Sequence, residues 1–403
     1  MTHVRAWLAY VPAAIALGIV ATLVSPLNDR FQFWFAGHLV ATGGSPYDQV
    51  AWGAAAGRYG DAAALVARNC ADPFSASCTW AYPPWTAWLY APFGLLEPDR
   101  GLPAIAAATL LCGAVSVVLL TRAVPLSAPS TMVVALVAVG GAPFVWDSFV
   151  GHFEPALLIG ALLLARGLGN GRTLPFVAGA VLLSLKPNLI VALVPLVGGV
   201  LLVGRRWRAL VATAVVMTAL ALIGLWREPA AIAALSGSMA KTAIVLPTTW
   251  SFAARTISGA APVVALSLVG ISITSAWVAV RSAQPEERAL VLVASGLALS
   301  LVVTPYAHLY DYVLLLPAIA TTIALLDRLG RAARMIGWVV IGFGYVAITW
   351  LAFLGGPHGD EPAASALIPV SSLVMLAVVS AGTLASGRNA SFRMRRAHAT
   401  TPR

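Results

Sequence analysis

The chain has 403 residues, of which 60% are hydrophobic and 10% are charged, and its mean hydropathy is +0.87. This composition excludes a soluble globular protein, because no soluble core of this size needs so much apolar sequence. The net charge of +10 does not indicate nucleic-acid binding, because the arginines occur in short loops between hydrophobic runs and in the tail, where the positive-inside rule explains them.

The first hydrophobic run, residues 7–24, is long enough to cross a bilayer, which takes about 20 residues. It follows a short flank with His3 and Arg5 and lacks a convincing cleavage site, so it is interpreted as a retained anchor. Asp29 then stands just outside the far membrane face, at the head of an aromatic segment that ends at His38. Its carboxylate can act as a base, although Asp29 could also merely cap an interfacial helix.

Thirteen hydrophobic runs are candidate spans, and several of them are shorter than a full crossing. They cover roughly residues 7–25, 82–97, 101–121, 131–146, 154–167, 173–185, 188–204, 208–226, 262–280, 289–303, 309–326, 335–354 and 364–386. The arginine-rich connections between them are predicted to be cytoplasmic. These are residues 166–172, 205–208, 281–288, 328–334 and 388–403.

This topology fails once, because five candidate spans precede residues 166–172, whereas a cytoplasmic N-terminus requires an even number. One of them must be re-entrant or interfacial, and either 101–121 or 131–146 is suspected. The sequence predicts about twelve crossings in a single transmembrane domain, residues 1–386, with both termini cytoplasmic. A large outer loop with interfacial helices (26–81) and a basic cytoplasmic tail (387–403) complete it, and no internal repeat is visible.

The predicted topology collects most of the polar side chains on the outer face, and ionisable groups at the membrane are candidates for function. They include Asp29, His38, Asp48, Asp147, His152, Glu154, Lys186, Arg255, His308 and Asp311. His308 and Asp311 would share one helix face. Each has an ordinary alternative: Lys186 could be a snorkelling lysine, Asp147, His152 and Glu154 could solvate a loop, and Trp250 and Arg255 could anchor the interface.

Soluble catalytic signatures are missing from the sequence, which has no Walker loop, nucleophile elbow or HExxH helix. An activated substrate should therefore arrive through lipid. Cys70 and Cys78 lie in the outer loop, where one disulfide is plausible in an oxidising compartment. Cys112 falls within a predicted span and is interpreted as a small core residue.

Several short motifs occur in an order that resembles a known superfamily. They are Asp29 after the first span, Phe35-Ala36-Gly37-His38, Gly43-Gly44-Ser45-Pro46-Tyr47, Ala81-Tyr82-Pro83-Pro84, Gly151-His152-Phe153-Glu154-Pro155, Leu185-Lys186-Pro187, residues 247–259, and Thr304-Pro305 to Asp311. The order resembles the GT-C superfamily, and within it glycosyltransferase family 87, the polyprenol-phosphate-mannose-dependent mannosyltransferases that were formerly a domain of unknown function. His152 and Glu154 replace amide residues of the family pattern, which bears on the acceptor and the donor sugar.

The resemblance implies a GT-C-type helix bundle and a hexosyltransferase in the bacterial cytoplasmic (inner) membrane, with its active site on the outer side. It would move a hexose, with mannose favoured, from a polyprenyl-phosphate donor to a glycan or glycolipid with inversion, without metal, cofactor or nucleic acid. Asp29 would be the general base. Lys186, Arg255 and His308, in that order, would bind the donor phosphate. Asp311, His152, Glu154, Tyr82, Trp250 and Asp48 would bind substrate.

Three alternatives remain at this point. One is a transferase of the same superfamily that uses another sugar, such as arabinose or glucose. Another is a lipid or glycolipid transporter, which should show repeat symmetry and polar groups near the bilayer midplane. A silent membrane scaffold is the third. Because the polar residues gather at one face, the enzyme is preferred. The sequence does not locate the groove that would hold the prenyl chain.

Overall fold

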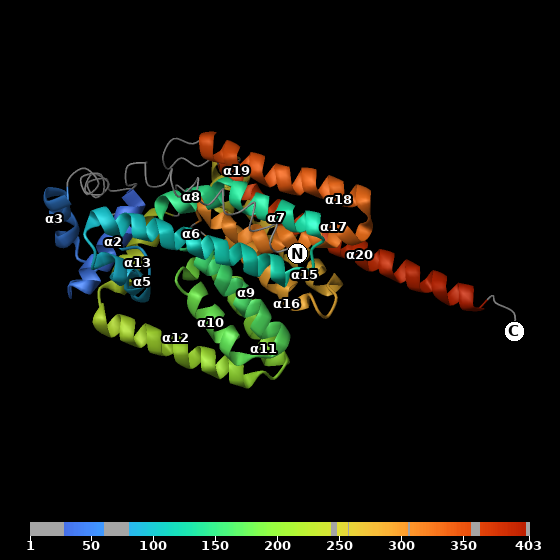
Figure 1. The fold of residues 1–403 in the computed structure, drawn as a ribbon, viewed down its shortest axis with the longest axis horizontal. Helices are drawn as coiled ribbons and strands as arrows, with labels where there is room; N and C mark the ends of the chain where they lie inside the picture. Colours follow the sequence, from blue (N-terminus) through green and yellow to red (C-terminus); the bar gives the residue numbers. More distant parts are fainter. Residues whose placement is uncertain are drawn as a thin grey trace.

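The computed structural model describes residues 28–59, 80–242, 248–256, 258–304, 307–355 and 363–399. Every regular element within these ranges is a helix (Figure 1). This confirms the all-α fold, and the hydrophobic helices confirm a polytopic membrane protein. The first candidate span, residues 7–25, and the cysteines Cys70 and Cys78 lie outside the described residues, so the anchor and the disulfide stay predictions.

The helices follow one another with short connections, and prolines stand in the first turns of α5, α6, α7, α8, α9, α15 and α17, where a missing N–H costs nothing. The α-helices are α2 (Asn28–Ala41), α3 (Gln49–Tyr59), α5 (Pro84–Gly94), α6 (Pro98–Ala123), α7 (Ala128–Gly140), α8 (Ala142–Val150), α9 (Glu154–Asn170), α10 (Thr173–Leu183), α11 (Leu193–Val203), α12 (Trp207–Arg227), α13 (Ala231–Thr242), α14 (Thr249–Thr256), α15 (Ala261–Ser282), α16 (Arg288–Val303), α17 (Leu316–Leu329), α18 (Arg331–Gly337), α19 (Gly344–Gly355) and α20 (Leu367–Ala399). Short 3₁₀ segments are η2 (Pro187–Ile190), η3 (Ser258–Ala260), η4 (Leu309–Leu315) and η6 (Ala363–Ala366), and η5 (Trp338–Phe343) is a π-helix.

Six helical stretches in the described residues are long and apolar enough to cross a membrane. They are α6, α12, α15, η4 with α17, the stretch from α18 to α19, and the first part of α20. Four shorter apolar helices, α7, α10, α11 and α16, accompany them. Every candidate span after the first therefore coincides with helix, while the number of about twelve crossings stays a prediction.

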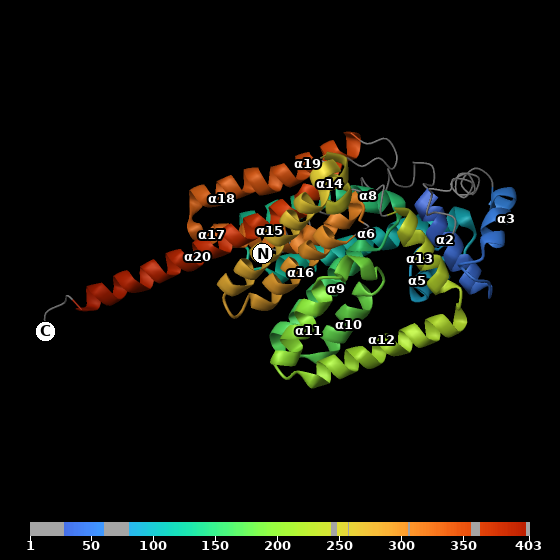
Figure 2. The same ribbon diagram turned by 180° about the vertical axis from the view of Figure 1, so that it is seen from behind.

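One end of the molecule gathers α2, α5 and α13, and the C-terminal part of α20 projects from the opposite end (Figures 1 and 2). Two glycines allow α2 and α5 to touch. A Cβ at Gly94 would lie 2.1 Å from the backbone nitrogen of His38, and a Cβ at Gly37 would lie 2.3 Å from the Tyr90 carbonyl oxygen. The indole of Trp34 also donates to the Leu96 carbonyl at 3.1 Å. These contacts hold α2, at the start of the predicted outer loop, against α5.

The contacts of the loop between α6 and α7 bear on which of the early segments crosses the membrane. The backbone N–H of Ser127 and the hydroxyl of Ser130 donate to the Asp327 carboxylate at 3.1 and 2.8 Å. Asp327 directly precedes residues 328–334, which the positive-inside rule places in the cytoplasm. On that rule the loop is predicted to lie at the cytoplasmic end, and the 26-residue α6 is long enough to reach it from the other side.

Of the two segments suspected of not crossing, 101–121 forms the 26-residue α6, which is long enough to cross, and α5, with 11 residues, is shorter than α6. Which early segment does not cross stays a prediction. Segment 131–146 is divided at Gly140 and Gly141 into α7 and α8, which follow one another directly. If α5 lies at the interface, four candidate crossings precede residues 166–172, and the parity is even. Cys112 lies within α6, but it is half-buried and not one of the fully buried core residues that the sequence suggested.

The first prediction tests this topology with single cysteines in a chain whose native cysteines are replaced by serine. Ala128→Cys, at the exposed start of α7, is expected to react with a membrane-impermeant maleimide only from the cytoplasmic side. Ala332→Cys is the matched cytoplasmic control, and Val50→Cys, 81% exposed in the outer loop, is the outer control. Labelling of Ala128→Cys together with Val50→Cys would show that α6 does not cross.

Candidate active site

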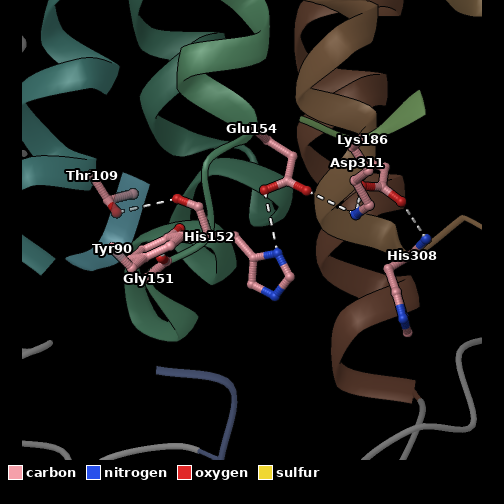
Figure 3. A network of polar contacts seen from close by, with 8 residues as sticks. All are labelled: Tyr90, Thr109, Gly151, His152, Glu154, Lys186, His308 and Asp311. Carbon is pink, nitrogen blue, oxygen red and sulfur yellow. Dashed lines mark hydrogen bonds and ion pairs between the residues drawn. The ribbon is translucent and has the colours of Figure 1, made fainter. Parts of the chain in front are cut away.

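Three segments that are distant in the sequence meet at a buried lysine. The Lys186 ammonium lies 2.9 Å from Oε1 of Glu154, the first residue of α9, and 2.5 Å from Oδ1 of Asp311 in η4 (Figure 3). Lys186 is 1% exposed and both carboxylates are fully buried. Since an isolated charge in such surroundings is very costly, the three side chains stabilise one another as a unit. We call this unit the Lys186 network.

Local structure explains how Lys186 reaches this position. It stands between the end of α10 and Pro187, with φ −139° and ψ 77°, and a residue before proline avoids the helical region. The indole of Trp85 donates to the Ser184 carbonyl at 3.2 Å, and the Thr86 hydroxyl donates to the Leu185 carbonyl at 3.1 Å. The turn is thus tied to α5.

The two carboxylates are also fixed by the helices that carry them. Asp311 uses its second oxygen, Oδ2, to accept the backbone N–H of His308 at 2.7 Å, which caps the start of η4. Glu154 occupies the first turn of α9, where the helix dipole favours a negative charge. Each carboxylate therefore has a local reason for its place in addition to its bond with Lys186.

The stretch from Gly151 to Glu154 is held by hydrogen bonds from two neighbouring helices. The Tyr90 hydroxyl donates to the Gly151 carbonyl at 3.2 Å, and the Thr109 hydroxyl donates to the His152 carbonyl at 3.1 Å. Gly151 has φ +73°, and a Cβ there would lie 2.8 Å from Ile105, so this position requires glycine. As a result His152 Nδ1 lies 3.4 Å from Glu154 Oε2 (Figure 3).

Aromatic rings surround the charged groups. The Lys186 ammonium lies 4.7 Å from the ring centre of Tyr310 and 5.9 Å from that of Tyr82, within the range of cation–π attraction. The His152 ring lies 4.2 Å from Tyr310 and 4.5 Å from Phe33, measured between ring centroids. The rings exclude water, and this strengthens the ionic contacts.

Tyr82 is itself held by the outer loop. Its carbonyl accepts a hydrogen bond from the Tyr47 hydroxyl at 2.6 Å. Burial, with the Glu228 carboxylate nearby, raises the pKa of the Tyr47 phenol, so this hydroxyl stays a donor at neutral pH. The Ser45 hydroxyl in turn donates to Glu228 at 2.5 Å.

Asp29 belongs to the first turn of α2, and its side chain lies outside the described residues. Its backbone position is nevertheless informative. Phe33, one turn later on the same face of α2, places its ring against His152. Arg30 is buried beside Gly151, because a Cβ on that glycine would come within 3.3 Å of the Arg30 side chain. The start of α2 and the start of α9 therefore lie together.

Asp147 was a candidate from the sequence without an assigned role, and Arg30 was not a candidate, yet both are buried next to the network. Asp147 is fully buried in α8, where its carboxyl group contacts the Glu154 side chain and interacts electrostatically with Lys186. Asp147 stood out as a charged residue in an otherwise apolar segment. Arg30 offered no such signal, because a single arginine just beyond a predicted span is ordinary.

The remaining selected residues are more dispersed. His308 is half-buried, with its ring 4.8 Å from that of Tyr310. Trp250 is 42% exposed, and its indole donates to the Val303 carbonyl at 3.3 Å. Arg255 lies in α14, with its side chain outside the described residues. Exposed Asp48 accepts the N–H of Val50 at 2.9 Å, as an N-cap of α3 does.

Comparison with known proteins gives one finding. A sequence profile described as glycosyltransferase family 87 matches residues 80–305, which is more than half of the chain. This range includes α9 with Glu154 and the turn with Lys186. No curated protein and no solved structure matches the chain.

The second prediction concerns the stability of the Lys186 network. Lys186→Met leaves two buried carboxylates without their cation, so it is expected to lower the free energy of unfolding by about 3–5 kcal/mol. Adding Glu154→Gln and Asp311→Asn removes the surplus charge and should restore most of that loss. Unfolding of the purified protein in mixed detergent micelles measures both effects.

The matched control for this prediction is Arg328→Met, which breaks the partly exposed ion pair with Glu287. A partly exposed pair is worth at most about 1 kcal/mol, so this variant is expected to stay close to the unmodified protein. Equal stability of Lys186→Met and Arg328→Met would contradict the structural role of the network.

Proposed function

The chain belongs to glycosyltransferase family 87, and on that premise we propose that it moves a hexose, with mannose as the first candidate, from a polyprenyl-phosphate sugar to a glycan or glycolipid acceptor. The chain is thus a membrane glycosyltransferase, and the proposal concerns its donor, its acceptor and its mechanism. We place the reaction at the outer face of a bacterial cytoplasmic membrane, at the end of the bundle where α2 and α5 lie.

The observation that carries the proposal is the meeting of α2 with the Lys186 network. A network of buried charges in an apolar bundle is costly, and a polar group at this depth is a candidate for function. The contact between Phe33 and His152 brings the α2 turn with Asp29 to the same end of the bundle. One site can therefore combine a carboxylate at the membrane surface with the fixed charges behind it.

In the proposed reaction Asp29 takes the proton of an acceptor hydroxyl, and the hydroxyl oxygen attacks the anomeric carbon of the donor sugar. The bond from that carbon to the phosphate oxygen breaks, and polyprenyl phosphate leaves with the electron pair. Phosphate is a good leaving group that needs no proton, so one base suffices. A single displacement inverts the anomeric configuration, and the proton on Asp29 then passes to solvent.

The proposed phosphate-binding residues are His308 and then Arg255, whereas the sequence alone ranked Lys186 first. The Lys186 ammonium already contacts two carboxylates and is 1% exposed, so it offers little net positive charge to a ligand. His308, in contrast, is half-buried, and its backbone N–H donates to the Asp311 carboxylate of the network. We therefore assign the contact with the donor phosphate to His308. In this proposal Lys186 holds η4, which begins directly after His308, in position.

The proposed sugar-binding residues surround the same position. Glu154 and Asp311 belong to the Lys186 network, and His152 and Tyr82 lie next to it. Exposed Trp250 offers a flat indole face to a sugar or prenyl group. Asp48 contributes by capping α3 in the outer loop and, in the proposal, by facing the acceptor. These assignments use only side chains at the outer end of the bundle.

The third prediction names the donor class. Purified protein in lipid nanodiscs is given a panel of polyprenyl-phosphate sugars with one soluble glycan acceptor and one glycolipid acceptor. Transfer from the mannose donor, with inverted configuration at the anomeric carbon by NMR, is expected to exceed transfer from the glucose and arabinose donors. Transfer from another sugar would change the donor assignment, and lipid movement between leaflets without transfer would favour a transporter.

The fourth prediction tests the general base. Asp29→Asn is nearly isosteric and cannot accept the proton, so kcat with the preferred donor is expected to fall about 10²–10⁴-fold. Asp99→Asn, an exposed aspartate in the first turn of α6, is the control and should keep full activity. Turnover of purified, folded Asp29→Asn at the rate of the control would remove Asp29 from the mechanism.

A further inference from the structure

A pocket of about 190 Å³ lies where α15 ends, α16 begins and α17 ends, beside α20, which packs against all three helices. Asp311 of the Lys186 network and Arg328 of this pocket stand near opposite ends of the 21-residue stretch formed by η4 and α17. The pocket is therefore remote from the candidate active site. The positive-inside rule places this end of the bundle in the cytoplasm.

Ser380 of α20 is the residue that points to a ligand. Its side chain lines the pocket and is 1% exposed, and its hydroxyl has no hydrogen-bond partner among the described residues. Ser371 and Ser372 of the same helix, in contrast, donate their hydroxyls to the Ile368 carbonyl, as serines within helices can. Because a buried hydroxyl without a partner is costly, the Ser380 hydroxyl is suited to a polar group that enters the pocket.

Arg328, in the last turn of α17, brings a positive charge to the same pocket. Its Nη1 donates to Oε2 of Glu287 at 3.2 Å, and its Nη2 donates to Oε1 of the same carboxylate. A guanidinium carries five N–H donors, so the others can bind a second oxyanion while the ion pair with Glu287 persists. Arginine is well suited to phosphate, because its planar donors match the geometry of phosphate oxygens.

The charges around the pocket also favour an anion. Residues 281–288 and 327–334 together contain five arginines and three carboxylates. Glu287 would by itself repel an anion, but its charge is compensated by Arg328. Glu287 is the N-cap residue of α16 and makes no side-chain cap hydrogen bond, and the N-terminus of a helix attracts anions.

The remaining walls of the pocket indicate where such an anion comes from. Val291 of α16 and Leu325 of α17 line the pocket and are buried, and half-exposed Leu384 of α20 lines it as well. The apolar part of α20 ends at Ser386, so these residues lie close to the end of a candidate span, where lipid headgroups begin. A phospholipid would cover the apolar walls, whereas a free phosphate ion would leave them uncovered.

We propose that this pocket binds the phosphate group of a phospholipid from the cytoplasmic leaflet. The phosphate oxygens accept hydrogen bonds from the Arg328 guanidinium and the Ser380 hydroxyl, and the carbons next to the phosphate lie against Val291 and Leu325. Basic pockets between membrane helices on the cytoplasmic side are suited to lipid headgroups. The bound lipid joins α16, α17 and α20 at the end remote from the reaction.

Three variants separate a built site from a general attraction to basic residues. Ser380→Ala removes only the hydroxyl, which has no partner to lose among the described residues, so without added lipid this variant is expected to be as stable as the unmodified protein. Arg328→Met removes the cation and leaves Glu287 to repel the phosphate. Arg331→Met is the matched control, because exposed Arg331 is close in sequence but does not line the pocket.

Native mass spectrometry of the full chain in detergent, titrated with phosphatidylglycerol, measures the affinity. The apparent Kd is expected to rise about fivefold in Ser380→Ala and about tenfold or more in Arg328→Met, and to change less than about twofold in Arg331→Met. Equal losses in Arg328→Met and Arg331→Met would show a diffuse attraction and overturn the proposal. An unchanged Kd in Ser380→Ala would overturn it as well.

Thermal unfolding of the same samples identifies the source of the phosphate. Phosphatidylglycerol is expected to raise the unfolding midpoint of the unmodified protein, because a ligand that binds only the folded state stabilises it, and most of this rise should be lost in Ser380→Ala and Arg328→Met. Diacylglycerol with the same acyl chains and inorganic phosphate alone are each expected to leave the midpoint unchanged. An equal rise with diacylglycerol would remove the phosphate contact, and an equal rise with inorganic phosphate would remove the lipid. None of these measurements depends on the transferase reaction.

Discussion

A lysine ammonium inside an apolar helix bundle is tolerated only where carboxylates and ring faces compensate its charge. Lys186 meets this condition because Glu154 and Asp311 approach it from helices 32 and 125 residues away in the chain. The starts of α9 and η4 and the end of α10 must therefore converge on one point. Once they do, His308, His152 and Tyr310 are also fixed, since each is adjacent to a member of the network.

The same convergence orders the outer end of the membrane domain. Tyr90, Thr86 and Trp85 of α5 bond to the two turns that carry His152 and Lys186, and Gly37 and Gly94 let α2 approach α5 closely. The segment that begins with Asp29 is consequently held against the network rather than hanging from the membrane surface. The proposed base and the proposed phosphate site can then serve one substrate, as the proposed transfer requires.

The sequence predicted the helical class, the positions of the later spans and most of the network, because Glu154, Lys186 and Asp311 are rare ionisable residues in apolar surroundings. It could not predict their pairing, which depends on tertiary contacts. It expected His308 and Asp311 to meet on a helix face, whereas Asp311 accepts the His308 backbone N–H. The short α5 was also missed, because Leu95 and Leu96 continue the apolar run beyond the helix end at Gly94.

The central claim is that Asp29 and the residues around the Lys186 network act on one substrate. A double-mutant cycle in kcat/KM, with Asp29→Asn, His308→Gln and the combined variant, tests it most directly. If both side chains serve the same transition state, the combined loss is expected to be much smaller than the product of the two single losses. Single losses that multiply without any coupling would show that the two residues act independently and would contradict the account.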